Sequence, residues 1–307
     1  MGTAAPDSTA SAPEASGTGE ARGAHRTGGA SGARDGRLGR VGRVVRSPLG
    51  WMATGMLGVG LVSGLTATGP GPVPVLGAVA AVAAYRLIGR RVARRPVPEV
   101  ARRGAGRELL LGGGIGLGFV LVATFLITVL GGYSFSWKGG GVLSLVGSAA
   151  AVQIGAAVSE ELLFRGLALQ ALEQVWGSRA ALAVTSLFFG VAHLGTPGAT
   201  AWGGLSIALE AGALLGAAFL WRRSIWFVVG LHFAWNTAEQ LLGIPVSGHA
   251  PEGLFTVATH GSTFLTGGGF GLEASVVPVL IALALAARML VLARRDGGIK
   301  SRRRAGR

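Results

Sequence analysis

The sequence has 307 residues and no cysteine; half of it is apolar, only 14% is charged, and its mean hydropathy is +0.53. Soluble domains usually carry about 25% charged residues, so this composition excludes an ordinary water-soluble globule. The lack of cysteine excludes disulfides, Cys-zinc sites and thiol nucleophiles. The net charge of +14 is typical of nucleic-acid binding, but the basic residues stand between long apolar stretches, so we expect no nucleic-acid partner.

The first 46 residues are rich in Gly, Ala, Ser, Thr and Arg and contain few large apolar side chains. Such a segment cannot bury enough surface to offset the conformational entropy lost on folding. We therefore expect a disordered basic tail over 1–46, an eight-helix membrane domain over 47–295 and a basic tail over 296–307.

Apolar stretches of about the length of a membrane span recur beyond the N-terminal tail, and a spanning helix needs about 20 mostly apolar residues. Eight such stretches follow in chain order: 49–68, 73–89, 109–131, 142–172, 180–195, 203–221, 225–243 and 275–292. Lipid offers no partners for backbone amides, so each stretch should be helical. The sequence thus predicts an all-α polytopic membrane protein with about eight transmembrane helices. The long Gly-rich connection 244–274 leaves room for a re-entrant or interfacial piece.

The basic residues concentrate in alternate connections: before the first span, between the second and third, and after the fourth, sixth and eighth. Among Lys and Arg, the other connections carry only Lys138. With eight spans, every basic connection falls on one side, which is the positive-inside pattern. We therefore expect a multi-pass cell-membrane protein with both termini in the cytoplasm.

Pairs of glycines lie four residues apart on three of the predicted spans: Gly60 and Gly64, Gly112 and Gly116, Gly212 and Gly216. Small residues at this spacing allow close helix approach in lipid. We expect tight packing within the chain, and a dimer face is the alternative.

Ionisable residues within spans indicate function because they are costly there, at roughly 2.5–3.5 kcal/mol for Asp, Arg or Lys at mid-helix. The polar and ionisable residues of this kind are Glu160, Glu161, Arg165, His193, Glu210, His232, Asn236 and Glu239.

Two adjacent glutamates on the fourth span differ in their expected partners. Glu161 and Arg165 are four residues apart, so they share a helix face and can neutralise each other. Glu160 points about 100° away and has no local partner, which leaves its carboxylate free for chemistry. The alternative is a solvated Glu-Glu-Arg face at a helix end.

Two histidines stand on other spans. His193 follows Phe189 by four residues on the fifth, and His232 and Asn236 share one face of the seventh. Hydrogen-bond donors on one face suit a developing oxyanion, and a structural interhelix pair is the alternative.

A carboxylate and a histidine together can activate a water as general base, and a His–Asn pair can hold a tetrahedral oxyanion. The sequence therefore favours peptide hydrolysis without a covalent nucleophile and with no cofactor. A zinc ion held by Glu160, His193 and His232 is the competing account, although the His-Glu-x-x-His motif is absent.

Three elements occur in order along the chain: Glu160-Glu161-x-x-x-Arg165, Phe189-x-x-x-His193 and His232-x-x-x-Asn236. With them the chain resembles, over roughly 142–243, the CPBP family of intramembrane endopeptidases. That family includes the type II CAAX prenyl proteases and bacterial Abi-type, bacteriocin-processing relatives.

The resemblance implies that Glu160 and His193 activate water and that His232 and Asn236 stabilise the oxyanion. It also implies that Glu161 and Arg165 support the site. Glu210 and Glu239 match no family motif, and their roles stay open.

The implied substrate is a membrane-associated peptide or protein, which the sequence does not identify further. A non-catalytic membrane scaffold or a bacteriocin-immunity protein with the same fold is the alternative. A transporter with a proton relay is a further alternative, but the matching broken spans typical of transporters are not found.

Overall fold

The structure is a computed structural model that describes Gly2 and residues 42–301. The predicted N-terminal tail lies outside the described residues except for Gly2 and residues 42–46, the latter being helical. Of the predicted C-terminal tail, residues 302–307 also lie outside them.

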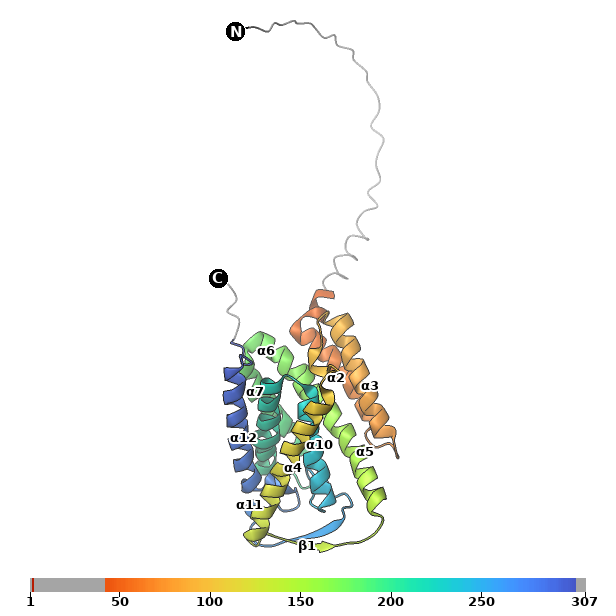
Figure 1. The fold of residues 1–307 in the computed structure, drawn as a ribbon, viewed down its shortest axis with the longest axis vertical. Coiled ribbons are helices and arrows are strands. Elements are labelled where there is room, and N and C mark those ends of the chain that lie inside the picture. Colours follow the sequence, from red (N-terminus) through yellow and green to blue (C-terminus); the bar gives the residue numbers. More distant parts are fainter. Residues whose placement is uncertain (1, 3–41, 302–307) are drawn as a thin grey trace. The chain divides into compact units, whose positions relative to one another are not determined.

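The described chain forms a bundle of helices that run between two ends (Figure 1). Each of the eight predicted spans is helical: α2 (Pro48–Thr66); α3 (Val73–Leu87) with η1 (Ile88–Val92); α4 (Ala105–Val129); α5 (Val142–Glu161) with η3 (Leu162–Leu169) and α6 (Gln170–Trp176); α7 (Ser178–Ala192) with η4 (His193–Gly195); α8 (Ala201–Ile207) with η5 (Ala208–Leu215) and α9 (Gly216–Arg222); α10 (Ile225–Leu241); and α12 (Val276–Arg295).

Seven of these segments in the described part of the chain are long and apolar enough to cross a membrane. The eighth, α10, has 17 residues, a length of about 25 Å. It packs against α4 and α5. The prediction of an all-α polytopic membrane protein is confirmed.

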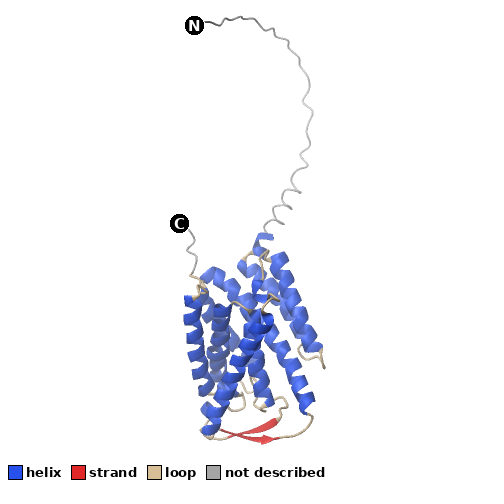
Figure 2. Cartoon of the chain, in the orientation of Figure 1, coloured by secondary structure: helices blue, strands red, loops and turns tan. Residues whose placement is uncertain are grey.

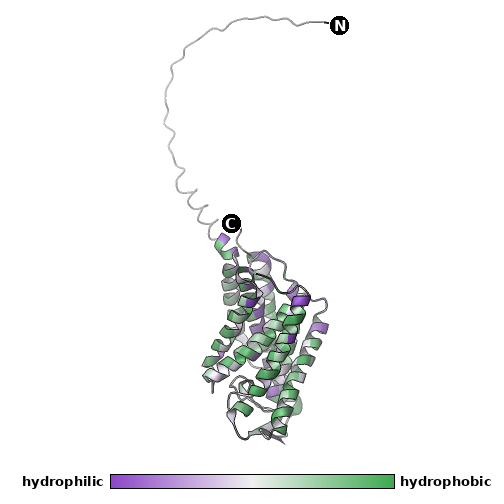
Figure 3. Cartoon of the chain, turned by 90° about the vertical axis from the view of Figure 1, so that its left-hand side faces the viewer, coloured by the Kyte–Doolittle hydropathy of each residue, from purple (hydrophilic) through white to green (hydrophobic). Residues whose placement is uncertain are grey.

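Many large apolar side chains of the bundle are exposed, and the hydropathy colours of Figure 3 show that hydrophobic residues run along its helices. Leu57, Leu110 and Phe125 are each more than 60% exposed. Such exposure is unfavourable in water but suits helices whose solvent is lipid.

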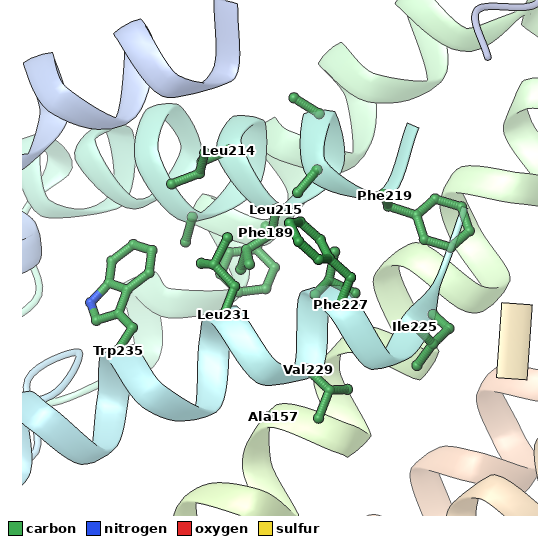
Figure 4. Packing of buried hydrophobic residues seen from close by; sticks show 14 of the residues in the cluster. Ala157, Phe189, Leu214, Leu215, Phe219, Ile225, Phe227, Val229, Leu231 and Trp235 are labelled. Atoms are coloured by element: carbon green, nitrogen blue, oxygen red, sulfur yellow. The ribbon is translucent and has the colours of Figure 1, made fainter. Parts of the chain in front are cut away.

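The apolar core is built around α10, whose buried face contacts the span formed by α8, η5 and α9 (Figure 4). Phe227, Leu231 and Trp235 follow one another at four-residue spacing along that face and are almost fully buried. This packing fixes the depth and rotation of the helix that carries His232 and Asn236.

Glycines let α4 and α10 approach backbone to backbone. A Cβ atom at Gly112 would lie 2.0 Å from the carbonyl oxygen of Phe227, and one at Gly116 would lie 2.2 Å from that of Leu231. The expected close packing within the chain is therefore found for this pair. It is not found for Gly60 and Gly64, where a Cβ atom would meet no heavy atom within 4 Å, because this face of α2 has no neighbour among the described residues.

Both ends of the described bundle, 42 and 301, lie on the same side (Figure 1). Contacts at this end join the basic connections: Arg222 at the end of α9 binds Glu108 near the start of α4, and Arg223 binds Glu173 of α6. The basic connections thus share one end, hereafter the basic end.

The opposite end carries a two-stranded antiparallel sheet of β1 (Tyr133–Trp137) and β2 (Phe255–Thr259) (Figure 2). The short helices α11 (Thr263–Thr266) and η6 (Leu272–Ala274) follow in the connection 244–274, and η6 is buried. The connection therefore folds back onto the bundle. The strands differ from the expected helices and loops, and the apolar–polar alternation of Tyr-Ser-Phe-Ser-Trp is the local signal for β1.

Candidate active site

The buried ion pair of the fourth span joins α5 to the sixth span. Nη1 of Arg165 lies 3.0 Å from Oε1 of Glu161, and Nη2 donates to the carbonyl of Ala211 at 2.7 Å. Both ionised side chains are almost fully buried. Arg165 stands in the π-helical segment η3, and Ala211 in the π-helical segment η5. Such segments occur frequently at functional sites.

Glu161 also holds His232, a contact that sequence spacing within one helix does not indicate. Nδ1 of His232 lies 2.8 Å from Oε1 of Glu161, so the histidine donates its Nδ1 proton to that carboxylate. This bond fixes the ring and turns Nε2 toward Glu160, whose Oε2 is 4.0 Å away. The separation is too long for a direct hydrogen bond.

Glu160 and Glu161 differ sharply in exposure, as their 100° separation on the helix implies. The Glu160 side chain is 30% exposed, whereas that of Glu161 is fully buried. Glu160 lines a cavity of about 410 Å³, and no hydrogen-bond partner of its carboxylate is found among the described residues. Its oxygens are therefore free to accept a proton.

His193 begins η4 at the end of α7, and its orientation is fixed by its own helix. Nδ1 lies 2.7 Å from the carbonyl oxygen of Phe189, so Nδ1 carries the proton and Nε2 is the basic nitrogen. The centroid of the Phe189 ring lies 4.7 Å from that of the His193 ring, and Cζ of Arg165 lies 4.8 Å from the same Phe189 centroid. Phe189 thus connects the supporting arginine to the histidine.

One cavity of about 410 Å³ collects the four predicted catalytic side chains, and Phe189 also lines it. They come from three spans: Glu160 from α5, His193 after α7, and His232 and Asn236 from α10. The cavity continues toward the end opposite the basic end, where Ser247 and other residues of the connection 244–274 form its wall.

Sequence reasoning missed Glu273, which lines the same cavity. Its Oε1 accepts hydrogen bonds from the backbone N–H of Ser247 at 2.9 Å and from the Ser247 hydroxyl at 3.1 Å. Burial raises the pKa of Glu273 to about 7. The two hydrogen bonds anchor the loop around Ser247 to η6, a contact for which the local sequence gives no signal.

Glu239 and Glu210 stand behind this wall and do not line the cavity. Glu239 accepts a hydrogen bond from the Trp235 indole at 2.9 Å and is in side-chain contact with Glu273. Both carboxylate oxygens of Glu210 are buried without a hydrogen-bond partner in the described structure. No ion pair to these three carboxyl groups is present within residues 42–301.

The competing zinc account requires at least three converging ligands. Within the described residues, no three His, Cys, Asp or Glu side chains are arranged to hold a metal ion together. Glu161 is engaged by Arg165 and His232, and Nδ1 of His193 is engaged by Phe189. Glu160, His193 and His232 do not form such a group in the described part of the chain, although these contacts leave Nε2 of both histidines without a hydrogen bond.

The sequence matches one family of known proteins. The family model described as type II CAAX prenyl endopeptidase Rce1-like matches residues 42–238. No curated protein and no solved structure matches the chain. The family match spans well over half of the sequence and includes the four predicted catalytic residues, while Glu239 and Glu273 lie beyond it. The chain belongs to the type II CAAX prenyl endopeptidase Rce1-like family.

Proposed function

We propose that this protein is an intramembrane endopeptidase that hydrolyses a peptide bond in a membrane-associated peptide or protein. We further propose that it acts in the cell membrane with both termini in the cytoplasm, as the basic end indicates. The observation that carries the proposal is the shared cavity of Glu160, His193, His232 and Asn236.

Water is the proposed nucleophile, and Glu160 is its base. The carboxylate takes a proton from water as the water oxygen attacks the scissile carbonyl carbon. Nε2 of His193 accepts a second hydrogen bond from the same water and orients it. As the C–N bond breaks, the proton held by Glu160 passes to the leaving amine nitrogen.

The oxyanion of the tetrahedral intermediate is assigned to His232 and Asn236. The Asn236 amide can donate directly, whereas His232 must carry a second proton to donate from Nε2, because Nδ1 is bonded to Glu161. The Glu161 carboxylate at Nδ1 balances the charge of that form, because Glu160 holds the water proton in the intermediate. Glu161 and Arg165 then act as positioning residues.

Cleavage of a peptide library by the purified full chain tests this function. The library should include peptides with apolar segments, since the cavity wall is mostly apolar. Glu160→Gln removes the base and keeps the shape, so cleavage should fall by about 10² or more. Glu252→Gln is the matched control, because Glu252 is 74% exposed and pairs with Lys138 at the surface.

Equal cleavage by the wild type and by Glu160→Gln would contradict the assignment of the base. A wild-type protein that is folded but cleaves no peptide in the library would favour the non-catalytic scaffold or immunity role.

A further inference from the structure

The acidic side chain Glu173 organises the basic end of the bundle. Arg223 donates to both of its carboxylate oxygens, at 2.8 and 2.6 Å, and Lys300 donates to Oε2 at 2.9 Å. The hydroxyl of Ser178 donates to Oε1 as well. Glu173 is thus saturated and offers no acceptor to further cations.

Two arginines beside it, Arg179 and Arg294, are exposed and form no ion pair among the described residues. They stand at the start of α7 and at the end of α12. Both line two adjoining cavities of about 430 and 440 Å³. We call the combined space the basic slot.

The two halves of the basic slot differ in polarity. The first is lined by apolar side chains, namely Leu182, Leu220, Leu290 and Val291. The second is lined by Trp176, Lys300 and Ser301, beside the same two arginines. Leu182 follows Arg179 by three residues and Leu290 precedes Arg294 by four, so the apolar half lies one helical turn deeper in the bundle.

The C-terminal segment closes the slot on the side away from the membrane. The backbone N–H of Lys300 donates to the Ser178 hydroxyl at 2.8 Å, and its carbonyl accepts from the Ser178 N–H at 2.9 Å. Residues 296–301 therefore run from α12 back to α7. What remains accessible is a cationic rim above an apolar recess between two lipid-facing helices.

We propose that the basic slot binds an anionic glycerophospholipid of the inner leaflet, with the phosphate between Arg179 and Arg294 and an acyl chain along the leucines. Guanidinium groups bind phosphate through charge-assisted, often bidentate hydrogen bonds. Basic pockets between helices on the cytoplasmic side suit lipid headgroups. A free phosphate would satisfy the arginines but would leave the apolar half empty.

Thermal unfolding of the purified full chain in detergent tests the site without any measurement of proteolysis. The probes are dioctanoyl phosphatidylglycerol, dioctanoyl phosphatidylcholine, and glycerol phosphate, which has the anion but no chains. A ligand of the folded state raises the unfolding midpoint in a saturable manner. We expect saturable stabilisation by phosphatidylglycerol and little by the other two.

Three variants separate a specific site from general attraction. Arg179→Gln/Arg294→Gln should raise the half-saturating phosphatidylglycerol concentration about tenfold or more. Val291→Trp should fill the apolar half and abolish saturable stabilisation, since Val291 is 46% exposed and tolerates a larger side chain. Arg103→Gln/Arg107→Gln removes the same charge from exposed arginines of the same end and should respond like the wild type.

An equal loss in the Arg103/Arg107 variant would show non-specific electrostatic attraction and overturn the site. Equal stabilisation by glycerol phosphate would assign a simple anion site instead. An unchanged response of Val291→Trp would exclude an acyl chain from the slot.

Discussion

Replacing Arg165 with methionine should destabilise the fold far more than removing a surface charge. The change deletes the 3.0 Å contact to Glu161 and the bond to the Ala211 carbonyl, and it leaves the fully buried Glu161 carboxylate with the His232 hydrogen bond as its remaining contact. Breaking one side of a buried pair costs about 3–5 kcal/mol, most of it from the uncompensated charge. The matched control Lys138→Met breaks an exposed pair and should cost about 0–1 kcal/mol.

A double-mutant cycle identifies the origin of this loss. Glu161→Gln alone should also destabilise, because it strands the Arg165 charge. The double variant removes both charges, so its loss should be well below the sum of the two single losses. The assay is the unfolding midpoint and the yield of monodisperse protein in one detergent. Additive losses would show that these residues do not form one buried, mutually neutralising unit.

Three other predictions concern pH, topology and packing. The pKa of Glu273 in the folded protein, about 7, is above the ordinary value of 4.5. The protonated carboxyl therefore stabilises the fold fully below about pH 4.5. This contribution, about 3 kcal/mol at most, disappears as the pH rises through 7. Stability should therefore fall between pH 5 and pH 8 in the wild type and change less in Glu273→Gln; parallel pH curves would contradict this. The chain has no cysteine, so an impermeant maleimide should label Ser136→Cys in intact cells and Ser301→Cys only after lysis, and the reverse pattern would contradict the orientation. Gly112→Ala should lower stability by about 1–3 kcal/mol through overpacking, whereas Gly60→Ala, with no neighbour within 4 Å, should be neutral or stabilising, as unfolding midpoints would show.

Much of the fold follows from the sequence because lipid imposes simple rules. Spanning length and hydropathy locate the eight helices, and the arginine distribution predicts that their basic connections share one end. Gly112 faces α10, whereas Gly60 has no neighbour within 4 Å. This difference depends on how each helix is rotated about its axis, which the spacing of glycines does not specify. The strands β1 and β2 pair across 117 or more residues of intervening chain, so local reasoning does not predict their pairing.

Part of the candidate site can also be predicted from the sequence, because its residues stand on helices. Helical spacing indicates that Glu161 faces Arg165 and that His232 and Asn236 share a face. Such spacing does not predict contacts between different spans, such as the hydrogen bond from His232 to Glu161. Glu273 illustrates the limit more strongly, since it reaches the cavity only because the connection 244–274 folds back onto the bundle.

The most direct test of the central claim, water activation by Glu160 without a metal, is the initial cleavage rate of a metal-stripped sample. The rate is measured on a peptide from the library, and the metal content is assayed on the same sample. We expect the stripped protein to retain its rate and Glu160→Gln to lose it. Loss of the rate on stripping, with full recovery at about one zinc per chain, would contradict the account and make Glu160, His193 and His232 metal ligands.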